Sequence, residues 1–281
     1  AASFLGRTIS WTEEGLELEA DEKHVKILLD EWNMQDCNPC DTPLANEGKG
    51  KNEGELMNPG MATFFRRAAA RINYLSQDRP DLNVVSRVIA MRMANPRCGD
   101  EQLIKRVVRY LRGKPRVKYC YSWGGDIGKL EVYTDSDWAG EQEKRRSTSG
   151  GVLLFGGHLI GHWSKLQNNP APSSGEAELN SGTKGLSELL GVRHLLEQLG
   201  VNVELVHYID VSAAKGVMLR RGAGKIKHLE VRQLWSQHMV DKFRVEVIKI
   251  PRRVNLADNL THTVSRRAME LFHDAVGLSY F

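Results

Sequence analysis

The sequence contains no run of 18 or more apolar residues, although 41% of its 281 residues are hydrophobic. A membrane-spanning helix needs a run of about that length, so we predict a protein with no membrane partner. The first ten residues, "AASFLGRTIS", also lack the basic stretch and apolar core of a secretory signal. A starting Met is absent as well, which is expected of a processed or cut piece of a longer chain.

Cysteine is scarce, and one spacing alone suggests a metal site. Cys37 and Cys40 form a C-x-x-C in "DCNPCDTP", whereas Cys98 and Cys120 stand alone. A structural zinc site usually needs a second closely spaced pair, which this sequence lacks. We therefore expect four free thiols in a reducing compartment.

Charge is unevenly distributed along the chain. Residues 1–60 contain five Lys and Arg against thirteen Asp and Glu, a net charge of −8. Because the whole chain carries +4, the remaining residues carry +12. A basic body favours a polyanionic partner such as nucleic acid, although a solvated basic surface would explain the same charge.

Hydrophobic periodicity divides the chain into three parts. Residues 1–59 predict a hairpin, a helix and a linker rich in Gly, Pro and charge. Residues 60–125 show three helical segments and then a strand-like run. Residues 126–281 change to three strands, a long helix and alternating strands and helices, closed by one helix over 255–276. This last pattern predicts a mixed α/β sheet with packed helices.

Four acidic residues stand at the ends of the elements predicted in the last part. Asp135 ends its first strand and Asp210 ends the strand "VELVHYID", where neighbouring strands often form a site. Glu178 lies on a helical face with two glycines and several apolar residues, a face that must pack on the sheet. Asp258 begins the last predicted helix.

Helix capping or a favourable interaction with the helix dipole is an ordinary explanation for Glu178 and Asp258. Asp is disfavoured in strands, so the positions of Asp135 and Asp210 at strand ends have no equally ordinary structural explanation. If all four carboxylates meet, their mutual repulsion requires cations, and oxygen-only ligands select Mg²⁺ or Mn²⁺. Two such ions about 4 Å apart stabilise both the attacking and the leaving oxygen in phosphodiester cleavage.

Five motifs in this region resemble one protein family. The runs "YTDSDWAGEQEKRRSTSGG", "HWSKLQNNPAPSSGEAEL", "YIDVSAAKG", "IKHLEVRQLWSQHMV" and "NLADNLTH" are similar, in order and spacing, to the ribonuclease H domain of copia-type LTR retrotransposon Pol polyproteins. The resemblance covers roughly residues 128–270. Upstream, "MQDCNPCDTP", "RRAAARINYLSQDRPDL" and "LIKRVVRYLRGK" resemble the end of that family's reverse transcriptase.

The resemblance implies a ribonuclease H-like mixed five-stranded sheet with packed helices over residues 126–281. It assigns residues 1–59 to the end of the polymerase domain and 60–125 to a helical region that resembles a thumb or connection. The family's polymerase motif, "YVDD", is missing from the sequence, so this chain is not expected to polymerise alone. The upstream polymerase domain of the same polyprotein is therefore an expected partner. The implied location is the cytoplasm or nucleus, or a virus-like particle.

Residue by residue, the family's metal-binding acids fall on Asp135, Glu178, Asp210 and Asp258. The resemblance thus implies a catalytic centre that uses two Mg²⁺ or Mn²⁺ ions to hydrolyse the RNA strand of RNA–DNA hybrids. Two departures are present: "GEAELNSG" lacks the aromatic residue usual after "EAE", and His262 stands where a Lys is common. We expect these departures to affect packing or rim contacts more than the acidic set.

Hydroxyl and basic residues near the acids are expected to contact the hybrid. Short hydroxyls would bind 2′-hydroxyl groups and basic clusters would bind phosphates, whereas turn chemistry and a solvated surface are the alternatives. His228 stands at the start of a predicted helix, and for it proton transfer and a purely structural role are further alternatives. The candidates are Arg145, Arg146, Ser147, Thr148, Ser149, Arg220, Arg221, Lys225, Lys227 and His228, with Arg252 and Arg253 as a further basic pair.

Two other functions stay open from the sequence alone. The first is a catalytically inactive, nucleic-acid-binding remnant of a retrotransposon polyprotein, which differs from the enzyme only in lacking metal-dependent cleavage. The second is a different two-metal nuclease on the same fold, such as a relative of integrases or resolvases, which substrate preference would distinguish.

Overall fold

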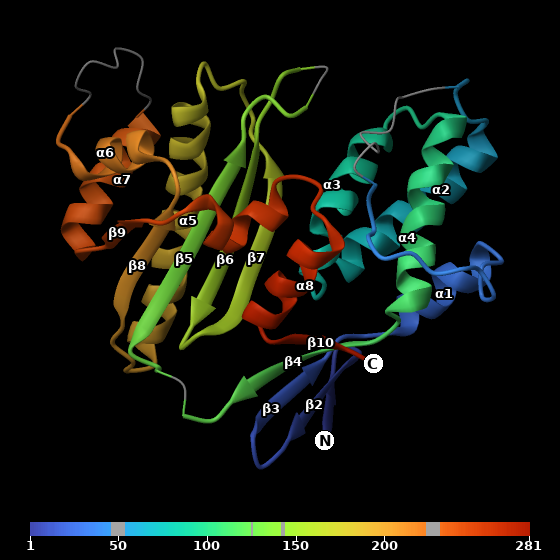
Figure 1. The fold of residues 1–281 in the computed structure, drawn as a ribbon, viewed down its shortest axis with the longest axis horizontal. Helices are drawn as coiled ribbons and strands as arrows, with labels where there is room; N and C mark the ends of the chain where they lie inside the picture. The colour runs from blue at the N-terminus through green and yellow to red at the C-terminus, as the bar shows by residue number, and fades with distance from the viewer. Residues whose placement is uncertain (46–53, 125, 142–143, 223–230) are drawn as a thin grey trace. The chain divides into compact units, whose positions relative to one another are not determined.

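The computed structural model describes residues 1–45, 54–124, 126–141, 144–222 and 231–281. These residues form two compact units: unit 1 is Ala1–Trp123 with Thr263–Phe281, and unit 2 is Gly124–His262 (Figure 1). Each unit contains its own five-stranded sheet. The domain expected over 126–281 therefore differs from unit 2, because its last residues pack in unit 1.

The sheet of unit 1 is antiparallel and has the order β1-β2-β3-β4-β10. The predicted hairpin forms β2 and β3. The C-terminal strand β10 was not predicted; it pairs with β4 so that Leu278 lies opposite Tyr119. The strands are β1 Ala2–Phe4, β2 Arg7–Trp11, β3 Gly15–Glu19, β4 Val117–Ser122 and β10 Leu278–Tyr280.

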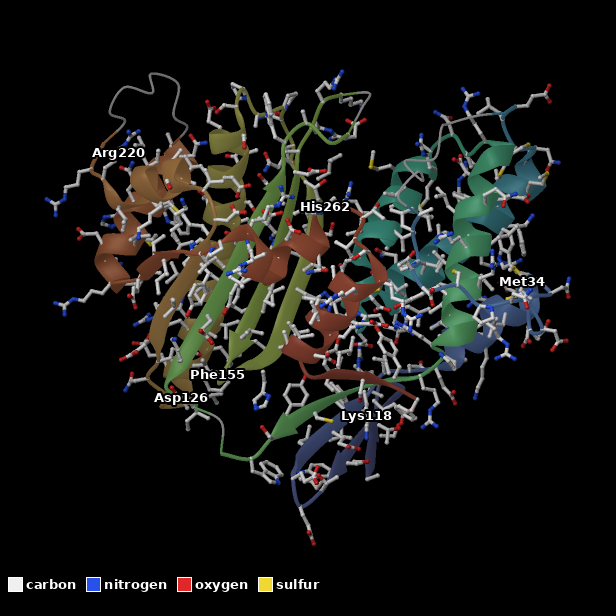
Figure 2. The ribbon with its side chains drawn as sticks, viewed as in Figure 1. Met34, Lys118, Asp126, Phe155, Arg220 and His262 are labelled. Atoms are coloured by element: carbon white, nitrogen blue, oxygen red, sulfur yellow. The ribbon has the colours of Figure 1, made fainter. Side chains whose placement is uncertain are left out.

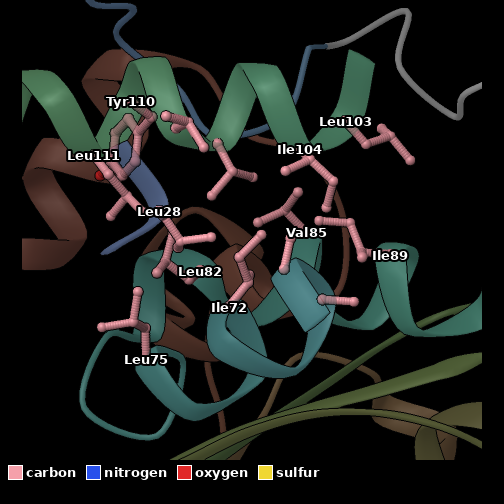
Figure 3. Packing of buried hydrophobic residues seen from close by; sticks show 14 of the residues in the cluster. Leu28, Ile72, Leu75, Leu82, Val85, Ile89, Leu103, Ile104, Tyr110 and Leu111 are labelled. Carbon is pink, nitrogen blue, oxygen red and sulfur yellow. The ribbon is translucent and has the colours of Figure 1, made fainter. Parts of the chain in front are cut away.

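The helices of unit 1 pack around one apolar core. The three helical segments predicted within residues 60–125 form α2, α3 and α4, and Figure 3 shows Ile104 of α4 pointing toward Val85 and Ile89 of α3. The described helices are α1 Lys23–Glu31, α2 Pro59–Leu75, η1 Pro80–Leu82, α3 Asn83–Arg92, η2 Cys98–Asp100, α4 Glu101–Gly113 and α8 Arg266–Ala275.

The prediction of one closing helix over residues 255–276 is wrong. This stretch forms a short 3₁₀ helix, η4 Leu256–Leu260, in unit 2 and the helix α8 in unit 1. Between them lie the β-branched residues Thr261 and Val264, which are poor helix formers. Ser265 then starts α8 as its N-cap, because its hydroxyl accepts a hydrogen bond of 3.3 Å from the backbone of the first turn.

Unit 2 contains the predicted mixed five-stranded sheet, in the order β7-β6-β5-β8-β9. Strands β5, β6 and β7 are antiparallel neighbours, whereas β8 runs parallel to β5 and β9 runs parallel to β8. The strands are β5 Lys129–Asp137, β6 Thr148–Phe155, β7 His158–Leu166, β8 Glu204–Ile209 and β9 Glu246–Lys249.

Close contacts at two glycines hold elements on both faces of this sheet. The long helix α5, Ser174–Gln198, crosses one face, where a Cβ added to Gly185 would lie 2.3 Å from Thr134 Cγ2 (Figure 1). The short helix η4 lies against β6, where a Cβ added to Gly150 would lie 2.8 Å from Ala257 O. The remaining described helices of unit 2 are α6 Ser212–Leu219, α7 Val231–Phe243 and η3 Arg252–Val254. Within the described ranges, no helix combines the length and apolar character that crossing a membrane requires.

Replacement of Gly185 by alanine is expected to destabilise the protein by about 1–3 kcal/mol, because the added methyl group must push α5 away from β5. The matched variant Gly191→Ala lies in the same helix, where an added Cβ meets no atom within 4 Å. That variant is expected to be neutral or to stabilise the protein by up to about 1 kcal/mol. Urea unfolding measures both variants, and equal effects would contradict the close packing at Gly185.

Candidate metal centre

The parallel strands β5 and β8 bring two aspartates to the same edge of the sheet. Tyr133 lies opposite Tyr208 in this pairing, so Asp135 and Asp210, two residues further along each strand, emerge beside each other. Asp135 is 2% exposed, and its Oδ2 accepts a hydrogen bond of 2.6 Å from Thr261 Oγ1. Asp210 directly follows β8, and its buried Oδ1 has no hydrogen-bond partner among the described residues.

Helix α5 adds a third carboxylate at the same edge. Ser173 caps this helix and sets its start, and Glu178 lies little more than one turn further on, 4% exposed. Its Oε1 accepts hydrogen bonds from the backbone N of Ser136 at 3.0 Å and from Ser136 Oγ at 2.9 Å. Its buried Oε2 has no hydrogen-bond partner in the described part of the chain. The helical face predicted to pack on the sheet therefore carries Glu178 into this site.

The 3₁₀ helix η4 contributes the fourth carboxylate. Asn255 anchors η4 to β5, because its Nδ2 donates a hydrogen bond of 2.9 Å to the carbonyl oxygen of Thr134. Asp258 then lies near Asp135, and its Oδ1 accepts a hydrogen bond of 2.7 Å from Arg252 Nε. One of the arginines expected to contact phosphate is thus paired with an acid of the site.

The four carboxylates come together as two trios that share Asp135. The first trio is Asp135, Glu178 and Asp210, and the second is Asp135, Asp258 and His262. Within each trio, one potential ligand atom per residue lies within 4.8 Å of the other two. The sequence pattern thus indicated acids that do lie close together, while their use as metal ligands stays a prediction.

Burial and mutual repulsion raise the pKa of these acids. Burial, with added repulsion from Asp210 and Asp258, raises the pKa of Asp135 to about 7, although the hydrogen bond from Thr261 opposes this shift. Burial and the charges of Asp135 and Asp210 raise the pKa of Glu178 to about 8. The pKa of Asp210 is also raised, chiefly by burial. Ionised together, these groups need a cation, and their unpartnered oxygens fit Mg²⁺ or Mn²⁺.

The hydroxyl residues expected to contact nucleic acid are buried, which contradicts that expectation. Ser147 and Thr148 are 0% exposed and Ser149 is 4% exposed. Ser147 Oγ accepts a hydrogen bond from the backbone N of Ala139 at 3.0 Å, and Ser149 Oγ accepts one from Gln167 Nε2, also at 3.0 Å. The Ser147 hydroxyl thus stabilises the loop between β5 and β6, in agreement with the turn chemistry considered as the alternative, whereas the Ser149 hydroxyl links β6 to the residue that follows β7.

Apart from Arg252 and Arg253 in η3, the described basic candidates lie in two places. Arg145 and Arg146 belong to the loop between β5 and β6, at the same end of the sheet as Asp135, and Arg145 is exposed. Arg220 and the exposed Arg221 follow α6, and Figure 2 shows Arg220 well apart from His262. Lys225, Lys227 and His228 lie outside the described residues.

Two features of the site were missed or misjudged from the sequence. His262 was expected to affect rim or packing contacts more than the acidic set, but it lies in the second trio, with its Nε2 3.6 Å from Asp258 Oδ2. Ser136 and Thr261, which hold Glu178 and Asp135, were not predicted, because a lone hydroxyl residue gives no signal of its partner.

The expectation of four free thiols is confirmed, and neither acidic trio contains a cysteine.

Known proteins that are similar to this chain include polyproteins of plant transposons and a solved ribonuclease H structure. The retrovirus-related Pol polyprotein from transposon TNT 1-94 of Nicotiana tabacum is 31% identical over 269 residues, which are 92% of this chain and 20% of that protein. The corresponding polyprotein from transposon RE1 of Arabidopsis thaliana is 28% identical over 281 residues, 98% of this chain and 19% of that protein. Among solved structures, LC11-RNase H1, isolated from compost by a metagenomic approach, has a TM-score of 0.36 at 19% identity and covers 48% of this chain and 94% of that chain. No family model matches the chain.

Unit 2 has the mixed five-stranded α/β sheet that the sequence resemblance implied, with a crowded carboxylate centre at one end of the sheet. The chain itself is a relative of the copia-type, retrovirus-related Pol polyproteins of plant transposons. It spans about one fifth of the length of those two relatives.

Proposed function

We propose that unit 2 is an endonuclease that hydrolyses the RNA strand of RNA–DNA hybrids during reverse transcription of a retrotransposon. The observation that carries this proposal is the pair of trios that share Asp135, because a shared carboxylate is suited to two neighbouring cations. The relationship to Pol polyproteins supports the choice of substrate, since such a polyprotein produces hybrids. The upstream polymerase domain of the same polyprotein is the proposed partner.

The proposed cofactors are two Mg²⁺ or Mn²⁺ ions held by Asp135, Glu178, Asp210 and Asp258. The oxygen donors suit these hard cations, and the unpartnered oxygens of Glu178 and Asp210 support the fit. When bound, such ions supply Lewis acidity that lowers the pKa of an attacking water and neutralises charge on the leaving 3′-oxygen.

The surrounding residues orient and balance the carboxylates. The hydrogen bond from Thr261 fixes the orientation of Asp135, and the two from Ser136 leave the second oxygen of Glu178 directed into the site. Arg252 favours the ionised forms of Asp135 and Asp210, because its positive charge lowers the pKa of both. These residues therefore hold the carboxylates in position for a cation before any substrate arrives.

Phosphate contacts are proposed for the exposed arginines of unit 2. Arg145 lies in the loop at the acidic end of the sheet, and Arg221 is 92% exposed at the end of α6. Their charges would position the hybrid backbone without recognising its base sequence.

The decisive experiment incubates the purified chain with labelled RNA–DNA hybrid, duplex DNA and duplex RNA, each with Mg²⁺, with Mn²⁺ and with chelator. We expect cleavage of the RNA strand of the hybrid alone, 5′-phosphate and 3′-hydroxyl ends, and no activity in chelator. Hybrid binding without cleavage under all conditions would support an inactive remnant instead. Cleavage of duplex DNA in preference to the hybrid would indicate a different two-metal nuclease.

A further inference from the structure

His262 is the member of the second trio that the proposed function does not use. It lies two residues after the end of η4 and is labelled in Figure 2. It shares with Asp135 and Asp258 a set of potential ligand atoms that lie within 4.8 Å of one another. His262 Nε2 lies 3.6 Å from Asp258 Oδ2. That distance is too long for a good hydrogen bond, so a direct hydrogen bond does not account for the positions of His262 Nε2 and Asp258 Oδ2.

Hydrogen bonding at Thr261 determines which ring nitrogen of His262 carries the proton. Thr261 Oγ1 lies 2.6 Å from Asp135 Oδ2 and 3.0 Å from the carbonyl oxygen of Asp258. Its single proton is donated to the carboxylate, which is the nearer and the stronger acceptor. The same Oγ1 lies 3.1 Å from His262 Nδ1 and therefore accepts a hydrogen bond from Nδ1–H. In the neutral ring, Nε2 is left with its lone pair, and it faces Asp258.

Two lone pairs that face each other at 3.6 Å repel unless a cation lies between them. Arg252 does not serve that purpose, because its Nε binds Oδ1 of Asp258 and leaves Oδ2 facing His262. Ligand atoms that are about 2.1 Å from one ion are separated by about 3.0–3.4 Å at angles of about 90–109°. The separation of His262 Nε2 and Asp258 Oδ2 is therefore close to that of two ligands of one metal ion.

We propose that His262 Nε2 is a nitrogen ligand of a divalent transition-metal ion that Asp135 and Asp258 also bind. A ring nitrogen is a favourable ligand for transition-metal ions, whereas Mg²⁺ prefers oxygen ligands throughout. The second trio therefore binds Mn²⁺ more tightly than Mg²⁺, while the all-oxygen first trio accepts either ion. The ion's part in cleavage rests on the proposed function, but its binding does not, because the trio exists in the free protein.

The test uses substrate-free protein loaded with Mn²⁺ and pulsed electron paramagnetic resonance, which detects a nitrogen nucleus bound directly to Mn²⁺. We expect nitrogen coupling in the wild-type protein and its loss in His262→Gln, together with about tenfold weaker Mn²⁺ binding and little change for Mg²⁺. The retained Mg²⁺ binding shows that the variant is folded. His238→Gln, an exposed histidine of α7, is the matched control and should keep the coupling.

Wild-type protein that binds Mn²⁺ without nitrogen coupling would overturn the proposed ligand, as would coupling that persists in His262→Gln. A hybrid-cleaving enzyme without the coupling would overturn this inference and leave the proposed function intact. Coupling in a protein that cleaves no hybrid would support the ligand and contradict the proposed function. The two proposals therefore fail separately.

Discussion

Asp210→Asn is expected to slow metal-dependent hydrolysis of an RNA–DNA hybrid by at least about a hundredfold, or about 2.7 kcal/mol in activation free energy. Asparagine has nearly the same shape as aspartate but no negative charge, so the first trio loses affinity for a cation while the packing is kept. The initial cleavage rate at saturating Mg²⁺ measures the effect. Rates equal to those of the wild-type protein would remove Asp210 from the site and, with it, the proposed nuclease.

The same substitution is expected to stabilise the metal-free protein. The charge of Asp210 helps to raise the pKa of both Asp135 and Glu178, so its removal relieves a repulsion. The melting temperature should rise by a few degrees in chelator, and the further rise caused by Mg²⁺ should shrink. Asp126→Asn is the matched control, because Asp126 lies just before the start of β5, away from the acids, and is labelled in Figure 2. It should leave the cleavage rate and the effect of Mg²⁺ unchanged.

The parts of the site that depend on local periodicity were predictable from the sequence. Steps of three and four residues place Glu178 on the buried face of α5, and Leu189 and Leu196 on that face are buried as expected. Leu199, the last residue of the predicted stripe, is 69% exposed because it caps the end of the helix beyond the sheet. The strand-end rule likewise anticipated that Asp135 and Asp210 lie side by side, since parallel strands end at a common edge.

The parts that depend on distant pairing were not predictable. Strand β10 is short, and its partner β4 lies more than a hundred residues earlier, so no local pattern announces that the C-terminal residues return to unit 1. A buried ion pair between Arg79 and Asp81, to which Tyr110 donates a hydrogen bond of 2.8 Å, also lies in that unit. Charged residues are normally exposed, so the presence of Arg79 and Asp81 in the sequence gave no sign that their side chains are buried.

Between pH 6.5 and 8, the metal-free protein is expected to lose stability as the pH rises. Burial and neighbouring charges raise the pKa of Asp135 to about 7 and that of Glu178 to about 8, far above their ordinary values. The folded protein therefore holds protons that the unfolded chain has released, and the free energy of unfolding falls as the pH approaches these folded values. Below pH 6.5 the buried His207, whose pKa burial lowers to about 3, contributes in the opposite direction, as does His273.

Glu178→Gln should remove much of this loss. Between pH 6.5 and 8 its free energy of unfolding should fall by about 1–2 kcal/mol less than that of the wild-type protein, because one proton contributes up to about 1.4 kcal/mol per pH unit. Glu188→Gln is the matched control, since Glu188 lies on the exposed side of the same helix in an ion pair with Lys184, and it should keep the wild-type slope. Mg²⁺ should restore stability most strongly at pH 8, where the carboxylates are ionised and free to bind it. Urea unfolding in chelator and in Mg²⁺ at several pH values measures these changes. A wild-type free energy of unfolding that stays constant or rises from pH 6.5 to 8 in chelator would contradict the crowding of these acids, because their ionisation must then cost the folded state nothing.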